Sequence, residues 1–310
     1  MTQFTSPFKL SILSTLLCST LAFHAGAIEV SQRANDIAHR YIIVDSHIDV
    51  PYRVNNKWQD VTKATSDGDF DYPRAKKGGL NAPFMSIYIP ATLEQPGKDS
   101  GVQLAHQLID SVEAIAARAP DKFAVAYSTD DVEKQFKQGL ISLPMGMENG
   151  SPVAGSLENL KTFYDRGIRY ITLSHSLSNH ISDSSYDLRR QWQGLSPFGK
   201  TLIPEMNRLG IMIDISHVSD QAFYQTLELT KAPVIASHSS LRKFTPGFER
   251  NMDDDMIKAL AKNGGVIQIN FGSSFVSAAT RKWGDVLKAK YEAAGTKWGE
   301  EKAQQIEKNF

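Results

Sequence analysis

The segment YIIVDSHIDVPYRV, residues 41 to 54, joins an apolar run to side chains that can bind metal ions. Asp45 follows the run, and His47 and Asp49 come next with one residue between them. Residues i and i+2 of a strand project from the same face, so the His47 imidazole and the Asp49 carboxylate can point at one ion. On this pair alone, a hydrogen-bonded strand end is the commoner interpretation.

The same arrangement recurs at the ends of further apolar runs. These runs end at Glu148, His175, His217 and His238. A parallel α/β barrel brings the carboxyl ends of its strands to one face, where active sites of this architecture lie. Imidazoles and carboxylates are ligands of zinc and similar divalent ions, and one carboxylate can bridge two ions. Two such ions would hold a hydroxide between them and polarise a substrate carbonyl, so the pattern predicts metal-assisted hydrolysis.

Two more carboxylates lie close in sequence to these candidate ligands. Asp45 precedes His47, and Asp214 precedes His217. Either carboxylate could orient an imidazole by accepting a hydrogen bond from it. Ordinary hydrogen bonding at a strand end explains both residues equally well, and the sequence leaves the choice open.

The elements that must position these side chains alternate along the chain. Gly residues close amphipathic stretches and lead directly into apolar runs at Gly167, Gly210 and Gly264. Strands are expected over residues 41–47, 82–90, 141–148, 168–176, 211–219, 232–239 and 266–274. Helices are expected over residues 102–118, 129–138, 157–165, 198–209, 219–229 and 253–262, and residues 55–77 are expected to form a long loop. The alternation predicts an α/β fold, a TIM-like (β/α) barrel of the metal-dependent hydrolase type that lacks the eighth strand.

The overall composition excludes some partners. Among 310 residues, 34 basic and 34 acidic side chains cancel, so no net field attracts nucleic acid or an anionic membrane. A small ligand is the expected partner. We expect residues 28–310 to form a single hydrolase domain, incomplete at its C-terminus.

The N-terminus has the layout of a secretory signal peptide. Lys9 precedes an apolar run over residues 10–23, and Ala25-Gly26-Ala27 follows. Cleavage is expected after Ala27, so residues 1–27 would be removed. The run is shorter than the roughly 20 residues that span a bilayer, so no stable membrane span is expected. The single cysteine, Cys18, lies in this segment. Export without disulfides predicts the bacterial periplasm.

Six stretches together resemble one family. They are VDSHIDVPY, GMENG, RGIRYITLSHSLSNHISDS, DISHVS, ASHSS and FERNMDDDMIKALAKNGGVIQINF, which lie between about residues 42 and 271. They resemble the membrane dipeptidase (renal dipeptidase-like) family of zinc metallopeptidases. The resemblance implies hydrolysis of the peptide bond of a free dipeptide with two zinc ions. One ion would be held by His47, Asp49 and Glu148, and the other by Glu148, His217 and His238.

The same resemblance implies roles for two further residues and a homodimer. His175 would contact the scissile carbonyl and stabilise the tetrahedral intermediate, beside the bridging Glu148. Arg250 would bind the C-terminal carboxylate of the dipeptide, because a guanidinium can bond a carboxylate through two donors. Without the other motifs, a packed strand-end histidine and a solvated loop charge would be the preferred interpretations of these two residues.

The sequence departs from the family at its C-terminal end. The family's eighth strand carries a Gly-x-Asp-Phe-Asp-Gly-like motif, whose first aspartate resembles a group that binds the substrate's free amine. No such motif follows Phe271, and the similar DGDFDY at residues 67–72 is expected to form a turn. A C-terminally truncated barrel is therefore expected. Two alternatives stay open: another barrel hydrolase acting on a cyclic amide, ester or lactam, and an inactive metal- or peptide-binding remnant.

Overall fold

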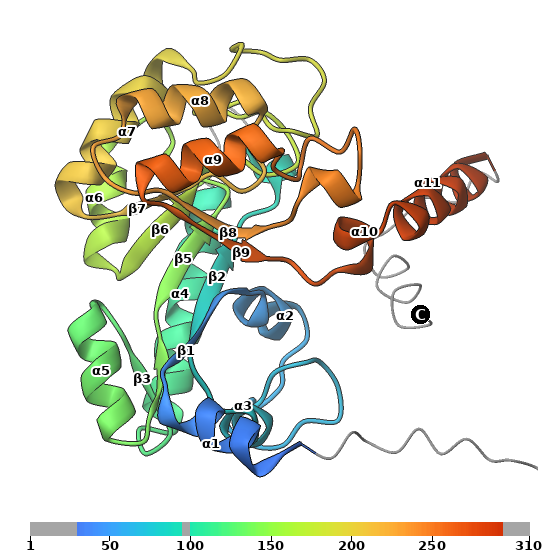
Figure 1. Cartoon of the computed structure of the whole chain (residues 1–310). Helices are drawn as coiled ribbons and strands as arrows, with labels where there is room; N and C mark the ends of the chain where they lie inside the picture. Colours follow the sequence, from blue (N-terminus) through green and yellow to red (C-terminus); the bar gives the residue numbers. More distant parts are fainter. Residues whose placement is uncertain (1–29, 95–99, 294–310) are drawn as a thin grey trace, which may run out of the picture.

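The computed structural model describes residues 30–94 and 100–293 (Figure 1). The signal peptide expected over residues 1–27 lies outside these residues. Within the described part of the chain, no helix combines the length and apolar character needed to cross a membrane.

A parallel sheet of seven strands forms the framework of the fold (Figure 1). In sheet order the strands are β1 (Ile43–Ile48), β2 (Leu80–Tyr88), β5 (Met145–Glu148), β6 (Ile168–Thr172), β7 (Met212–Asp214), β8 (Ile235–Ser239) and β9 (Val266–Ile269). Every neighbouring pair is parallel. The sheet curves into a nearly closed barrel, so the predicted fold and its seven strands are confirmed. All strands therefore end on one face.

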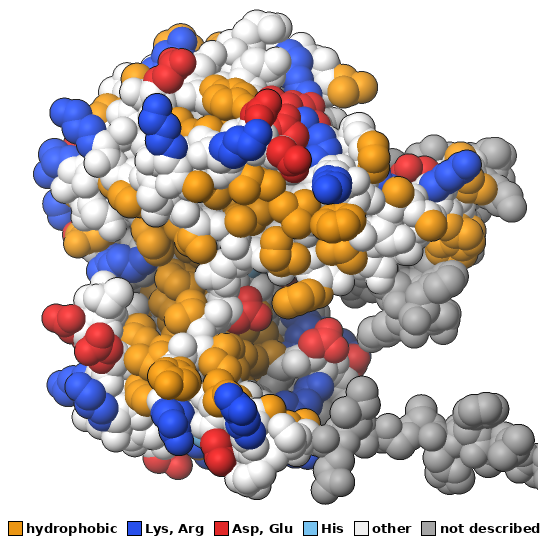
Figure 2. Space-filling model, in the orientation of Figure 1, with side chains coloured by type: hydrophobic (Ala, Val, Ile, Leu, Met, Phe, Trp, Pro, Cys, Tyr) orange, Lys and Arg blue, Asp and Glu red, His pale blue; other side chains and the backbone are white. Residues whose placement is uncertain are grey.

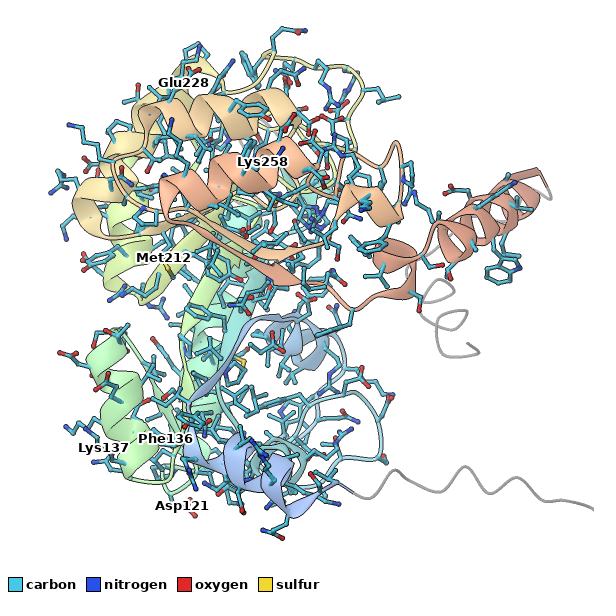
Figure 3. All side chains as sticks on the ribbon, in the orientation of Figure 1. Asp121, Phe136, Lys137, Met212, Glu228 and Lys258 are labelled. Atoms are coloured by element: carbon cyan, nitrogen blue, oxygen red, sulfur yellow. The ribbon has the colours of Figure 1, made fainter. Side chains whose placement is uncertain are left out.

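Helices alternate with the strands and cover the outside of the sheet. They are α4 (Ser100–Arg118), α5 (Thr129–Lys137), α6 (Leu157–Asp165), α7 (Pro197–Leu209), α8 (Asp220–Leu229) and α9 (Asp254–Asn263). Figure 3 shows Glu228 on α8 and Lys258 on α9 in the outer helical layer. The core lies between helices and sheet, where Leu108, Ile171 and Leu202 are fully buried.

Residue types at the helix ends explain where the helices begin and stop. Ser156, Ser196 and Ser219 each accept a backbone hydrogen bond as the N-cap of α6, α7 and α8. Gly210 ends α7 in the left-handed conformation, with φ +82°. The chain then enters β7 within two residues, which is the Gly-to-strand pattern found in the sequence.

The predicted loop over residues 55–77 is wrong in part. It contains the end of α2 (Val50–Asn56) and most of α3 (Tyr72–Gly78). The Asp71 carboxylate accepts a hydrogen bond from the Arg74 N–H at 2.9 Å, and Pro73 lies in the first turn. An N-cap followed by proline is a helix start, which the polar composition of the segment concealed.

The predicted strand over residues 141–148 is split at Pro144. Its first part, β4 (Ile141–Leu143), pairs with β3 (Phe123–Val125) in a separate two-stranded sheet. Its second part, β5, joins the barrel. Proline has no N–H to donate, so pairing changes there, and the Pro144 carbonyl accepts from the Met85 N–H at 2.8 Å.

The two edge strands, β1 and β9, are not paired with each other in the described residues. At the carboxyl end, β1 contacts β8 instead, where the Ser46 hydroxyl donates to the Ser237 carbonyl. Farther from that end, Val44 on β1 and Val266 on β9 are about half exposed, at 43% and 50%. Figure 2 shows a hollow on this side of the molecule with hydrophobic side chains in and around it. Three further helices flank the barrel. Near the N-terminus lies α1 (Gln32–Arg40), and after β9 come α10 (Ser273–Val276) and α11 (Ala278–Ala293), which project from the body in Figure 1.

Candidate metal centre

The carboxylate of Glu148, the last residue of β5, lies at the centre of the site. It is buried, and imidazoles from four other strand ends surround it. Its Oε2 lies 3.2 Å from Nε2 of His47. Its Oε1 lies 3.0 Å from Nε2 of His217, 3.1 Å from Nε2 of His238 and 3.6 Å from Nε2 of His175. The two oxygens of one carboxylate thus face different imidazoles, which is the geometry that a bridging ligand requires.

These side chains form two groups that could each hold a divalent ion. One group is His47, Glu148 and His238, and the other is Glu148, His175 and His217. Within each group the candidate ligand atoms lie within 4.8 Å of one another. The set of Glu148, His217 and His238 expected from the sequence is also compact, since the two Nε2 atoms lie 2.9 Å apart. Which imidazole binds which ion stays a prediction.

Asp49 lies at the edge of the site. Its Oδ1 is 3.4 Å from Nε2 of His47, but its side chain is 61% exposed. The i, i+2 spacing brings the two residues together as expected. Asp49 is also the N-cap of α2, where the backbone has already left the strand conformation, with φ −87° and ψ 29°. The strand alternation therefore ends before Asp49, which leaves this carboxylate nearer to solvent than the imidazoles.

Burial and mutual contacts set the charges in the site. Burial alone would raise the pKa of Glu148, but His47 and His175, with hydrogen bonds from His217 and His238, hold it well below its usual value. Burial lowers the pKa of His217 well below the usual value, with Arg250 adding to the effect. Burial and the neighbouring His47 lower the pKa of His238 to about 4. At neutral pH an ionised carboxylate therefore faces neutral imidazoles at His217 and His238. Burial alone would lower the pKa of His47, but Tyr170, Glu148 and Asp49 hold it well above its usual value.

The donor set fits divalent metal ions. A metal ligand must be deprotonated, and the neutral imidazoles of His217 and His238 beside the ionised Glu148 already meet that condition. Within the described residues, the buried Nδ1 atoms of His175 and His217 have no hydrogen-bond partner. Buried polar atoms are usually satisfied, so these two atoms mark a site whose polar groups are arranged for a ligand.

Asp214 acts on His238 rather than on its sequence neighbour His217. It is fully buried and accepts hydrogen bonds from the hydroxyls of Thr172 at 2.5 Å and Ser237 at 2.6 Å. The Ser237 oxygen lies 2.8 Å from Nδ1 of His238. A hydroxyl has one proton, and Ser237 gives it to Asp214, so Nδ1 of His238 must donate to Ser237. That leaves Nε2 of His238 as the atom facing Glu148.

Asp45 has no such connection to an imidazole. Its Oδ1 accepts a hydrogen bond from the backbone N–H of His47 at 3.0 Å. This contact shapes the strand end and leaves the His47 ring untouched. Of the two carboxylates that the sequence left open, the geometry gives Asp214 a link to a candidate ligand and Asp45 an ordinary strand-end role.

Two residues of the site, the candidate ligand His217 and Asn149, have a left-handed backbone. His217 has φ +69°, and Asn149, next to Glu148, has φ +70°. Non-glycine residues seldom adopt this conformation, and it concentrates at functional sites. The Asn149 side chain compensates locally, because it donates to the Ile89 carbonyl at 3.0 Å and accepts from the Asn179 amide at 2.9 Å. These contacts tie the loops after β2, β5 and β6 together around the site.

Arg250 is buried beside the imidazoles. Its guanidinium donates to the Ser239 hydroxyl and to the His238 carbonyl, each at 2.6 Å. Its Nε is buried and has no partner within the described residues, and the group lies 5.5 Å from the centre of the Phe275 ring. Burial lowers the pKa of this guanidinium. A fixed, desolvated cation beside the candidate metal centre is suited to bind an anionic group.

The sequence did not single out Tyr170, which contacts His47. Its hydroxyl lies 2.9 Å from Nδ1 of His47. A tyrosine inside an apolar strand gives no signal of this contact, because only the folded barrel places it opposite β1. His180, which the sequence left unassigned, has its Nδ1 3.0 Å from Oε1 of Glu94, so it pairs there and not with Glu148.

Comparisons with known proteins identify the family of the chain. A sequence model of the family described as membrane dipeptidase, peptidase family M19, matches residues 31–307. An uncharacterised dipeptidase of Schizosaccharomyces pombe is 30% identical over 259 residues, which are 79% of this chain and 63% of that relative. The chain thus spans less than two thirds of the length of this curated relative.

Solved structures show the same fold. The probable dipeptidase PvdM from Pseudomonas aeruginosa superposes with a TM-score of 0.75 at 27% identity, covering 84% of this chain and 68% of that one. Dipeptidase AC, a metallopeptidase of family M19, superposes with a TM-score of 0.69 at 25% identity, covering 76% and 74%. Because the family match includes nearly every described residue, the chain belongs to the membrane dipeptidase family, peptidase family M19.

Proposed function

We propose that the protein hydrolyses the peptide bond of free dipeptides with the help of two zinc ions. The observation that carries the proposal is the placement of Glu148, whose two carboxylate oxygens face different imidazoles. The names of the relatives support the substrate class, since both the fission yeast relative and the Pseudomonas aeruginosa structure are described as dipeptidases.

The candidate ligands would hold the ions as the sequence predicts. His47, Asp49 and Glu148 would bind one ion, and Glu148, His217 and His238 the other. Zinc ions bound there would supply an activated water nucleophile and polarise the scissile carbonyl. The chain itself supplies the fixed geometry, because Asp214 and Ser237 hold His238 in one orientation.

Two residues would bind and orient the substrate. His175 lies beside Glu148 with a side chain only 19% exposed, and burial lowers its pKa. Its neutral imidazole would donate a hydrogen bond to the oxygen of the scissile carbonyl as negative charge develops there. Arg250, a buried cation, would bind the C-terminal carboxylate and place the peptide bond over the ions. A free C-terminus would therefore be a requirement of the site.

Three further expectations stay predictions. Export to a bacterial periplasm depends on residues 1–27, and a homodimer depends on the family resemblance alone. The identity of the metal as zinc depends on the ligand types, since imidazoles together with the carboxylates of Asp49 and Glu148 suit zinc and similar divalent ions. Metal analysis of the purified protein would test this last point directly.

The decisive experiment measures amino acid release from a panel of L,L- and L,D-dipeptides by the purified chain with added zinc. His238→Ala would be measured beside it, with His39→Ala as the matched control, because His39 is an exposed histidine on α1. We expect turnover by the parent chain and by His39→Ala, and none by His238→Ala. If the chain binds zinc but releases no amino acid from any dipeptide, the proposed activity is wrong and a metal-binding role replaces it.

A further inference from the structure

Tyr170 reaches a candidate metal ligand from the far side of the barrel. Its strand, β6, is separated from β1 by β5 and β2 in the sheet. The side chain is fully buried, yet its hydroxyl lies 2.9 Å from Nδ1 of His47 on β1. The same hydroxyl donates to the Ser46 carbonyl at 3.1 Å. A single phenol thus contacts both the ring of His47 and the backbone next to it.

The intervening strands leave room for this ring. Gly146 on β5 is paired with Tyr170, and a Cβ at Gly146 would lie 2.0 Å from Cζ of the tyrosine. No side chain fits there while the ring keeps its place. On β2, Phe84 packs against the ring with centroids 5.2 Å apart. Glycine on one side and phenylalanine on the other therefore fix the path of the phenol across the barrel.

The protons of this contact can be assigned. A phenol has one proton, and the Ser46 carbonyl can only accept. Tyr170 therefore gives its proton to the Ser46 carbonyl, 3.1 Å away. The second contact of the hydroxyl must then be a hydrogen bond that it accepts, so Nδ1 of His47 is the donor. This leaves Nε2, which lies 3.2 Å from Oε2 of Glu148, to offer its lone pair to a metal ion.

We infer that Tyr170 is a positioning residue that fixes the tautomer and ring orientation of His47 as a metal ligand. Metal-bound histidines generally donate their second ring N–H to an acceptor, which holds the ring and sets which nitrogen binds. For His238 the acceptor is the Ser237 hydroxyl backed by Asp214. For His47 it is the Tyr170 phenol backed by the Ser46 carbonyl. The inference rests on zinc binding in the proposed function and is independent of turnover.

The test measures zinc affinity of the full chain by competition with a chromophoric chelator. Tyr170→Phe keeps the ring and removes only the hydroxyl. Losing such an acceptor weakens metal binding by about 10- to 100-fold, and we expect that loss at one of the two zinc sites. Tyr72→Phe is the matched control, because its ring packs against Phe123 and not against a ligand, and its zinc affinity should match that of the parent chain.

A second readout separates positioning from general destabilisation. In the ¹⁵N-histidine spectrum of the zinc-loaded parent chain, assigned with His47→Gln, His47 should show a protonated Nδ1 and a metal-bound Nε2. Tyr170→Phe should shift the Nδ1–H signal of His47 while the His238 signal stays in place. This measurement on the parent chain tests the inference even if Tyr170→Phe does not fold.

The outcomes are distinguishable. Unchanged zinc affinity of Tyr170→Phe overturns the inference and leaves the proposed function standing. A His47 ring bound through Nδ1 in the parent chain also overturns it. If the parent chain binds no zinc, the inference and the proposed function fail together. Gly146→Ala should reproduce the loss of affinity seen with Tyr170→Phe, because its methyl group displaces the tyrosine ring.

Discussion

The imidazole rings of His47 and His238 stack on each other, with centroids 3.9 Å apart and an interplanar angle of 27°. Their strands, β1 and β8, are not neighbours in the sheet. The contact is possible because β1 and β8 approach each other at their carboxyl ends, where the Ser46 hydroxyl donates to the Ser237 carbonyl. The candidate metal centre thus lies where the sheet comes closest to closing, and its geometry depends on this contact.

Replacing the central carboxylate should disrupt both ion sites at once. Glu148→Gln keeps the shape of the side chain and removes its charge. Both ions would lose an anionic ligand, since a neutral amide binds zinc much more weakly than a carboxylate, so we expect the affinity for two zinc ions to fall by roughly 100-fold or more. Zinc stoichiometry and affinity, measured by competition with a chelator, check this. The control is Glu205→Gln, which removes a carboxylate paired with Arg208 on α7 and should leave zinc binding unchanged. Loss of only one ion in Glu148→Gln would contradict a bridging role.

Replacing the buried guanidinium should affect substrates with a free C-terminus most. Arg250→Lys keeps a cation but loses the planar pair of donors that bonds a carboxylate, so Michaelis constants for dipeptides should rise about tenfold or more. A dipeptide whose C-terminus is an amide has no carboxylate to bind. The ratio of kcat/KM for dipeptide over dipeptide amide should therefore fall in Arg250→Lys. An unchanged ratio would show that Arg250 supports His238 and does not bind the substrate.

Much of the fold was predictable because its signals are local. Gly210 at the end of α7 lies next to the apolar run that forms β7 in the sequence. The alternation of such helix and strand units predicts the parallel barrel. The ends of these runs also predict that Glu148, His217 and His238 lie on one face of the barrel. The sequence does not predict helix α3, because the polar composition of the segment is typical of a loop. Only the N-cap carboxylate of Asp71 marks the start of the helix.

The contacts that orient the ligands were not predictable. Tyr170 acts across two intervening strands, and only the packing of the barrel interior shows that its hydroxyl meets His47. Sequence spacing places Asp214 near His217, but in the folded chain Asp214 accepts a hydrogen bond from Ser237 and so connects to His238. Sequence spacing predicts which side chains share a strand face. It does not predict which side chains meet across the barrel.

Close packing at the start of α7 should make one glycine irreplaceable. A Cβ at Gly199 would lie 2.1 Å from the backbone carbonyl oxygen of Ile181, which cannot move as a flexible side chain could. Overpacking of this kind costs about 1–3 kcal/mol, so Gly199→Ala should lower the free energy of unfolding by that amount in urea denaturation. Gly78→Ala is the matched control, because nothing lies within 4 Å of its added methyl group. Equal stability of the two variants would contradict the tight contact.

The loop over the site should lose stability in acid through Asp187. This buried carboxylate accepts hydrogen bonds from the Ser178 N–H at 3.0 Å and from Nε of Arg189 at 2.8 Å. The hydrogen bonds from the Arg189 side chain are the main reason why the pKa of Asp187 lies below its ordinary value of 3.8. In the same loop, the Ser185 N–H donates to the His217 carbonyl at 2.7 Å, so the loop is tied to a candidate ligand.

A carboxylate whose pKa is lower in the folded state stabilises the fold above its unfolded pKa, and this contribution disappears as pH falls through the folded pKa. Asp187→Asn should therefore lower the free energy of unfolding by about 1–2 kcal/mol at pH 7, since hydrogen bonds to a charged group are lost. The difference from the parent chain should stay constant down to about pH 5 and shrink below 3.8. Urea denaturation across this pH range measures the difference in the free energy of unfolding.

The control is Asp165→Asn, which alters an exposed pair with Lys161 and should show little difference from the parent chain at any pH. A constant difference for Asp187→Asn down to the lowest pH at which the chain folds would show that the charge of Asp187 contributes nothing.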